Sequence, residues 1–146
     1  MTREEKAVES FANGYNCAQS VFSAFSEDFG LDRATALKIA NGFGGGVRCG
    51  EVCGAVSGAV MAIGLKCGFH IEKDFEQKGF CNNKAFEFIE RFKEVNESML
   101  CRDILGIDIR FPEDFTTTEA RKLFTAICPS IVASAVQILE SMDFEQ

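Results

Sequence analysis

Residues 44–68, GGGVRCGEVCGAVSGAVMAIGLKCG, contain eight of the thirteen glycines and three of the seven cysteines of this 146-residue chain. Within them, Gly50, Gly54 and Gly58 are spaced four residues apart. On an α-helix this spacing forms a smooth stripe along which a second helix can pack closely. A glycine inside a helix costs about 1 kcal/mol relative to alanine, so a row of three predicts close packing that offsets this loss. We therefore predict an apolar helix over 51–66, packed against another helix of the chain or against a second copy in a homodimer.

The same glycines do not form a nucleotide-binding loop. A Walker-type loop ends in Gly-Lys-Ser/Thr, because its lysine contacts phosphate and its hydroxyl contacts magnesium. No such triplet follows these glycines. The dinucleotide pattern GxGxxG fails too, because its last position falls on Val47 or Cys49. The stretch is therefore interpreted as a packing element and not as a phosphate site.

Charge and hydropathy exclude two further classes of protein. The net charge of −7 repels phosphate backbones, and no run of lysine and arginine offers a local exception, so we expect no nucleic-acid binding. The N-terminal residues MTREEKAVESF lack the apolar core of a signal peptide. The longest nearly apolar run, 52–65, is too short to span a bilayer. We expect a cytoplasmic protein that does not associate with a membrane.

Apolar residues recur at helical spacing along the whole chain, whereas strand-like alternation is nearly absent. We predict an all-α fold in which residues 1–146 form a single domain, a bundle of six or seven helices. A short irregular segment is expected around 107–115, where Pro112 argues against a central strand. The stretch 69–82 is too polar to assign. The predicted helices and helical turns cover residues 3–12, 16–29, 33–43, 51–66, 83–98, 100–105, 117–126 and 129–142.

Local signals mark several of the predicted helix ends. Asn13 and Gly14 end the first helix, Asp32 is a suitable N-cap for the third, and Pro129 suits the first position of the last. The composition contains fifteen phenylalanines against one tyrosine and no tryptophan. Because phenylalanine has no polar atom, we predict that the helical phenylalanines fill the core, together with Ile39 and Val95.

Four cysteines lie near the beginning of predicted helices: Cys17, Cys53, Cys101 and Cys128. The N-terminus of a helix carries partial positive charge and unpaired N–H groups, which stabilise a thiolate and lower the pKa of the thiol. A thiolate attacks disulfides and ligates metals. We therefore select these four as the candidate catalytic, cofactor-binding or metal-ligating residues, without a preference between the two chemistries at this point.

The other candidate residues carry weaker signals. Cys49, Cys67 and Cys81 are interpreted as incidental, although Cys49 would reach Cys53 if the glycine-rich helix began early. No CxxC occurs, so thioredoxin-type, zinc-knuckle and CxxCH haem motifs are all absent. The single histidine, His70, is expected to be solvated. Arg48 and Glu51 flank Cys53 and would either tune its thiolate or bind an anionic substrate, with a surface ion pair as the more ordinary alternative.

The pattern of these residues resembles a known family of small redox proteins named after its cysteines, C_GCAxxG_C_C. The matching pieces are NCAQSV at 16–21, GFGGG at 42–46, GEVCGAVSGA at 50–59, Cys101 before DILG at 103–106, and Cys128. The resemblance implies that the four recurring cysteines of the family are Cys17, Cys53, Cys101 and Cys128. Similar cysteine domains accompany some cytochromes, which implies an iron–sulfur cluster as one option. Because this chain has no haem motif, the resemblance to those cytochrome-associated domains implies for it only the iron–sulfur cluster and no haem.

Three functions stay open from the sequence. The first is an iron–sulfur cluster or another metal held by the four thiolates for electron transfer, with structural zinc as the other metal, since no histidine is available. The second is thiol–disulfide chemistry, in which cysteine pairs cycle without a metal. Both require a redox partner protein. The third is a structural or interaction protein whose thiols are buried and inert.

Overall fold

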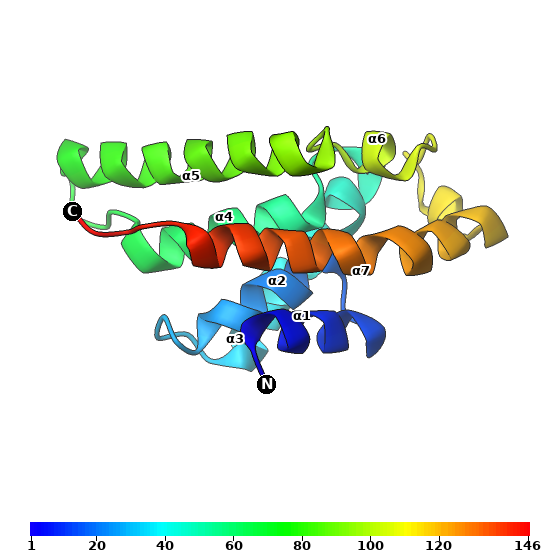
Figure 1. Cartoon of the computed structure of the whole chain (residues 1–146), viewed down its shortest axis with the longest axis horizontal. Coiled ribbons are helices and arrows are strands. Elements are labelled where there is room, and N and C mark those ends of the chain that lie inside the picture. The colour runs from blue at the N-terminus through cyan, green and yellow to red at the C-terminus, as the bar shows by residue number, and fades with distance from the viewer.

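The computed structural model describes all residues, 1–146, and contains seven α-helices and no β-strand, which confirms the all-α prediction (Figure 1). Within the segment 107–115, which was predicted to be irregular, residues 107–111 are irregular and residues 112–115 lie in a 3-10 turn. The α-helices are α1 (Arg3–Ala12), α2 (Cys17–Ser26), α3 (Arg33–Ala40), α4 (Gly54–Cys67), α5 (Phe75–Asn96), α6 (Cys101–Leu105) and α7 (Thr118–Ser141). Shorter turns are η1 (Asn41–Phe43), η2 (Gly46–Gly50) and η3 (Pro112–Thr116).

Helix α2 is the centre of the bundle. Every residue in it except Gln19 is buried, and it contacts α1, α3, α4 and α7. Its start is set by a reciprocal capping box: the Asn16 side chain accepts from the Gln19 N–H at 2.9 Å, and the Gln19 side chain accepts from the Asn16 N–H at 3.0 Å. This cap places Cys17 at the first position of the most buried helix.

The glycine stripe packs inside the chain, against α2. A Cβ on Gly58 would lie 2.6 Å from the Ala18 carbonyl oxygen, and a Cβ on Gly54 would lie 3.0 Å from the Ala18 nitrogen. The predicted boundary was wrong by three residues, because α4 begins at Gly54 and not at 51. Gly50 therefore belongs to the preceding turn, where its φ of +75° is not helical. The stripe consists of Gly54 and Gly58, which allow α2 and α4 to approach at backbone distance.

Helix α7 is one continuous helix, so the prediction that Pro129 opens a separate last helix was wrong. Pro129 removes one backbone hydrogen bond, yet the buried face of α7 continues on both sides of it. Packing against α1, α2, α4 and α5 outweighs the lost bond. By length and composition alone α7 could also cross a membrane. In this fold it is a core helix that runs along the long axis of the molecule (Figure 1).

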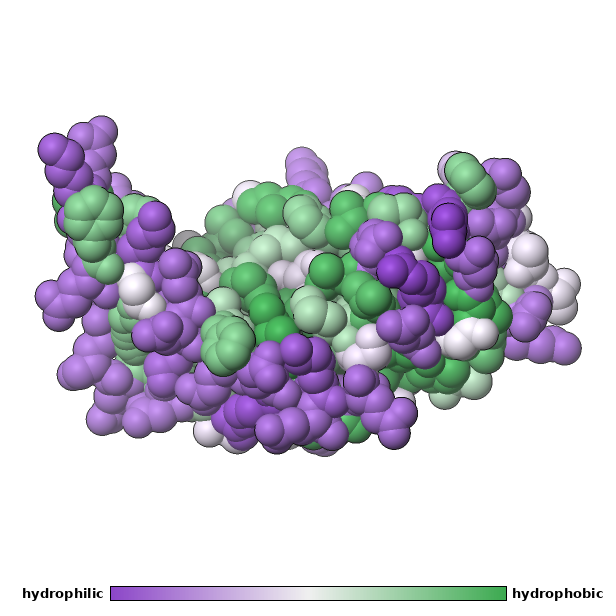
Figure 2. Space-filling model, turned by 90° about the horizontal axis from the view of Figure 1, so that it is seen from above, coloured by the Kyte–Doolittle hydropathy of each residue, from purple (hydrophilic) through white to green (hydrophobic).

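The prediction that the helical phenylalanines fill the core was correct only in part. On α5, Phe88 and Phe92 are fully buried, whereas Phe86 and Val95 are 65% and 63% exposed. Ile39 on α3 is 50% exposed. Helix α5 also begins at Phe75, earlier than predicted, with the Asp74 side chain accepting from the Gln77 N–H. Figure 2 shows that the face seen from above has a broad apolar area in its middle and hydrophilic residues toward both ends.

One buried polar atom in α2 has no partner and leads to a stability prediction. Ser20 is fully buried, and its hydroxyl makes no hydrogen bond. An unsatisfied buried hydroxyl destabilises a fold by about 1–3 kcal/mol. Ser20→Ala is therefore expected to raise the free energy of unfolding by about 1 kcal/mol, as measured by urea denaturation. Ser26→Ala is the matched control, because Ser26 is equally buried but donates to the Ser23 carbonyl. An equal gain in both variants would contradict the prediction.

Candidate functional site

Four elements of the chain each contribute one cysteine to a single cavity of about 540 Å³. Cys17 begins α2, Cys53 directly precedes α4, Cys101 begins α6 and Cys128 lies in the middle of α7. All four are buried, with 5–8% of each residue exposed, and none forms a disulfide. The structure therefore brings together all four cysteines selected from the sequence. The walls between them are mostly apolar and include Phe11, Ile104, Phe115, Phe124 and Ile131.

Cys53 and Cys101 are held side by side by a short antiparallel ladder. The Cys53 N–H donates to the Met99 carbonyl at 2.7 Å, and the Cys101 N–H donates to the Glu51 carbonyl at 2.6 Å. Val52 and Leu100 form the bridge between these bonds. This pairing was not predicted from the sequence, because each segment contributes only about three residues, too few for an alternating strand pattern to be visible.

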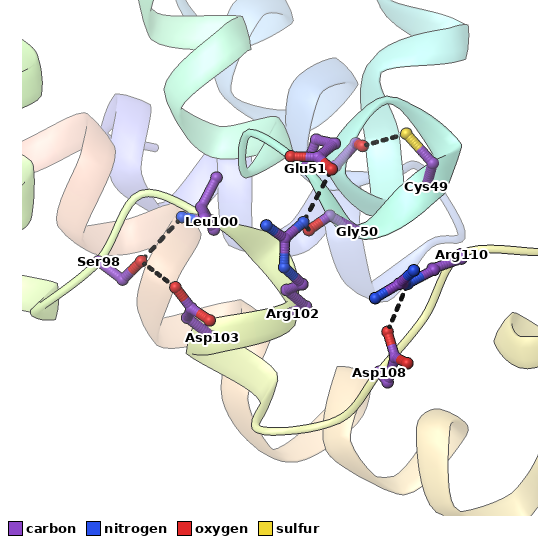
Figure 3. Close-up of polar contacts among 10 residues, drawn as sticks. Cys49, Gly50, Glu51, Ser98, Leu100, Arg102, Asp103, Asp108 and Arg110 are labelled. Carbon is purple, nitrogen blue, oxygen red and sulfur yellow. Dashed lines mark hydrogen bonds and ion pairs between the residues drawn. The ribbon is translucent and has the colours of Figure 1, made fainter.

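Side chains in and next to α6 add further contacts around the ladder between residues 51–53 and 99–101 (Figure 3). The Arg102 guanidinium lies 2.9 Å from a Glu51 carboxylate oxygen and donates to the Gly50 carbonyl at 3.2 Å. On the other side of α6, the Ser98 hydroxyl accepts from the Leu100 N–H and donates to the Asp103 carboxylate. These contacts fix α6, and with it Cys101, against the turn before Cys53. The expected surface ion pair is thus present at Glu51, with Arg102 as its partner, whereas Arg48 forms none.

The segment before Cys53 contains one turn of left-handed backbone. Gly45, Gly46, Val47 and Arg48 have φ values of +66°, +65°, +55° and +61°. Such residues usually occur singly in folded proteins, since each costs a non-glycine residue about 1–2 kcal/mol. The turn ends with the Arg48 guanidinium 4.3 Å from the centre of the Phe115 ring, at the wall of the cysteine cavity.

The pKa values of Cys17, Cys53 and Cys101 are all raised, which contradicts the prediction that the start of a helix lowers the pKa of a thiol. Burial raises the pKa of Cys53 to about 11 and that of Cys101 to about 12. Around Cys53 the N–H groups of Ala55 and Val56 do lower the pKa, as predicted, but burial outweighs them. Beside Cys101 the positive charge of Arg48 acts in the same lowering direction and is likewise outweighed. The N–H groups at the start of α4 therefore act on Cys53 in the predicted direction, but too weakly to offset burial.

Cys17 and Cys128 form an interacting pair. The hydrogen bond between the two thiols is the largest influence on both groups, raising the pKa of Cys17 and lowering that of Cys128. This corresponds to a Cys128 thiolate that accepts from the Cys17 S–H. The lowered pKa of Cys128 is caused by the neighbouring Cys17 thiol and not by the start of a helix. Cys128 was predicted near a helix start, but it lies inside α7. The two thiols therefore titrate as one interacting pair, in which loss of the first proton is favoured and loss of the second is disfavoured.

The remaining cysteines lie outside the cavity. Cys49 donates to the Gly46 carbonyl at 3.5 Å, and α4 begins too late for the predicted contact with Cys53 along a helix. Cys67 and Cys81 contact each other and donate to the same Ile63 carbonyl, at 3.2 and 3.9 Å. They form a second pair between α4 and α5 that the sequence analysis missed. His70 is exposed, as expected.

The cavity offers a metal ion or a cluster sulfur ligands alone. Its lining contains four thiols and no aspartate, glutamate or histidine, a donor set typical of iron–sulfur clusters. No three such side chains are grouped closely enough to hold one metal ion. The residues present therefore fit a cluster in donor chemistry and in shared cavity.

These features define a class of protein: a single helical bundle that buries four cysteines from distant segments around one cavity. The chain belongs to the family described as "Putative redox-active protein (C_GCAxxG_C_C)", whose profile matches residues 15–142. The matched range includes all four cavity cysteines, and the match confirms the resemblance seen in the sequence. Comparison with curated proteins and with solved structures finds no match.

Proposed function

We propose that Cys17, Cys53, Cys101 and Cys128 together bind an iron–sulfur cluster and that the protein transfers electrons. The observation that carries this proposal is the arrangement of four buried thiols, from four separate elements, around one cavity without a carboxylate. When bound, the cluster would supply one-electron chemistry. Zinc is less well supported, because a single tetrahedral ion needs ligands that meet at one point.

The chain's own residues would prepare and protect this site. The ladder between 51–53 and 99–101 positions two ligands, and the capping box at Asn16 positions a third. Apolar side chains surround the sulfurs and exclude water, which would slow loss of the cluster and tune its potential. The proposal includes a partner protein that donates or accepts electrons, and it places the protein in the cytoplasm.

The first test is the metal content of the full chain purified without oxygen. We expect stoichiometric iron and acid-labile sulfide. Cys→Ser at any of Cys17, Cys53, Cys101 or Cys128 is expected to remove most of the iron, since each supplies one ligand. Cys49→Ser, Cys67→Ser and Cys81→Ser are matched controls that should keep it, because these thiols lie outside the cavity.

Circular dichroism of each serine variant separates loss of iron from loss of fold, and Cys→Ala variants replace any that fail to fold. Stoichiometric zinc without iron or sulfide would contradict the cluster and indicate a structural zinc site. Iron retained equally in all seven variants would contradict the assignment of these four ligands.

A second candidate function rests on the place of Cys17 and Cys128 in one cavity and on the interaction of their thiols, which is the largest influence on the pKa of each. In this function the two thiols lose two protons and two electrons to form a disulfide, and a low-molecular-weight disulfide accepts them and becomes two thiols. Protein free of iron, sulfide and zinc would favour it. Mass spectrometry after treatment with that disulfide should then find a bond between Cys17 and Cys128. Seven unchanged thiols would indicate a structural protein with inert cysteines.

A further inference from the structure

The lysine, arginine, aspartate and glutamate side chains that line the cysteine cavity are all basic, although the protein is acidic overall. Two arginines, Arg48 and Arg121, line it, and no aspartate or glutamate does. The whole chain has a net charge of −7, with 22 acidic residues against 15 basic ones. A cavity that contains only positive side chains in such a protein attracts anions selectively.

Neither of these arginines has a polar partner within the chain. The Arg48 guanidinium lies against the Phe115 ring, and neither Arg48 nor Arg121 forms an ion pair or a side-chain hydrogen bond. Each of the other five arginines does: Arg3 with Asp28 and Glu140, Arg33 with Ser10, Arg91 with Glu87 and Ser141, Arg102 with Glu51, and Arg110 with Asp108. The two arginines without a partner are therefore the two that line the cavity, and their donors are available to a ligand.

The backbone that carries Arg48 is strained. Val47 and Arg48 both have positive φ, and for a β-branched residue such as Val47 this is a genuine outlier. Strain of this kind persists only where the surrounding structure imposes it, and it is concentrated at ligand sites. Here it places an exposed, unpaired guanidinium at the wall of the cavity. The left-handed turn thus positions Arg48 toward the space that a ligand would occupy.

The face of α7 relates the arginine end of the cavity to the sulfur end. Arg121, Phe124, Thr125 and Cys128 all line the cavity from this helix. Cys128 follows Arg121 by seven positions, which corresponds to about 10 Å along the helix axis. Phe124 lies between them and is stacked on Phe115, with ring centres 6.1 Å apart. A ligand that spans this distance needs an anionic end for the arginines and an apolar body for the rings.

We propose that Arg48 and Arg121 bind the anionic group of a small organic carboxylate or phosphate whose apolar body lies along Phe115 and Phe124 toward the cysteines. Arginine binds both anions through paired hydrogen bonds. The cavity volume of about 540 Å³ lies within the usual range of small-molecule sites, about 300–1,000 Å³. Binding of this ligand is independent of the proposed function. Exchange of electrons between the ligand and the cysteines rests on that function.

The test uses the full chain purified without oxygen and three probes in isothermal titration calorimetry. Phenyl phosphate carries the anion and the apolar body, inorganic phosphate only the anion, and phenol only the body. We expect phenyl phosphate to bind more tightly than either of the others. Arg48→Gln and Arg121→Gln should each weaken it about tenfold or more, and Arg48→Lys should weaken it less. Lys122→Gln is the matched control, because it removes one positive charge from the next residue of α7, outside the cavity.

Several results would overturn this inference. One is equal weakening by Lys122→Gln and Arg121→Gln, which would assign the effect to net charge. Another is an absence of phenyl phosphate binding in wild-type protein of confirmed fold. A change of reduction potential in Arg48→Gln with unchanged probe affinity would assign the arginine to the cysteines alone. Iron and sulfide contents are measured on the same samples, so failure of the cluster proposal and failure of the anion site are seen separately.

Discussion

Gly58→Ala is expected to lower the free energy of unfolding by about 2 kcal/mol, as measured by urea denaturation. The new methyl group would lie 2.6 Å from the Ala18 carbonyl oxygen and 3.2 Å from the Ala18 Cα. Both are backbone atoms of the most buried helix, so no side-chain rotation can relieve the collision. The gain in helix propensity from glycine to alanine, about 1 kcal/mol, is too small to compensate for the separation of α2 from α4.

Gly64→Ala is the matched control for this variant. Gly64 lies in the same helix, and a Cβ there would meet nothing within 4 Å. The substitution is therefore expected to stabilise the protein by up to about 1 kcal/mol. Opposite signs for the two variants would identify close helix packing as the reason for glycine at 58. A stabilising Gly58→Ala would mean that α2 and α4 are not in backbone contact.

Gly50→Ala is expected to have the larger effect, a loss of about 3 kcal/mol. Two causes add at this residue. Its φ of +75° is unfavourable for alanine, and a Cβ would come within 2.2 Å of the Ile109 carbonyl oxygen. The collision would push the Ile109 segment away from the turn before Cys53. We expect broader loss of the site as well, since Gly50 also accepts the Arg102 hydrogen bond that fixes α6.

Gly106→Ala isolates the conformational part of this effect. Gly106 has nearly the same φ, +73°, but nothing lies within 4 Å of its would-be Cβ. This control is expected to lose only about 1 kcal/mol. If the denaturation midpoints of the two variants coincide, backbone conformation alone explains Gly50, and the contact with Ile109 is unimportant.

Both large effects bear on the cysteine cavity, because the same contacts position the thiols. Ala18 follows Cys17 directly, so a shift of α2 away from α4 moves Cys17 relative to Cys53. Gly50 lies three residues before Cys53, beside the ladder that holds Cys101. The cluster proposal therefore predicts that iron content falls together with stability in each variant, whereas Gly64→Ala and Gly106→Ala keep it.

Much of the fold was predictable from local signals. Helical spacing identified most helices, and the predicted cap at Asp32 begins α3 in the structure. The cap at Asn16, which begins α2, was not predicted. The errors arose where tertiary packing overrides a local preference. Pro129 favours a helix start, but packing on both sides of it keeps α7 continuous. Phe86 fits a helical core pattern, but no element covers its side of α5 and it stays exposed.

The sequence by itself determined the all-α class, the family and the identity of the four cysteines, because helix periodicity, caps and the cysteine pattern are local or linear properties. Only the tertiary structure decided that these thiols line one cavity, since their neighbours come from segments far apart in the chain. It also decided their electrostatics. Burial depends on every surrounding element, and it raises the pKa of Cys53 and Cys101 more than a helix start lowers it. Only the tertiary structure likewise shows that Arg48 and Arg121 have no polar partner, because whether an arginine forms an ion pair depends on the side chains that the fold places beside it.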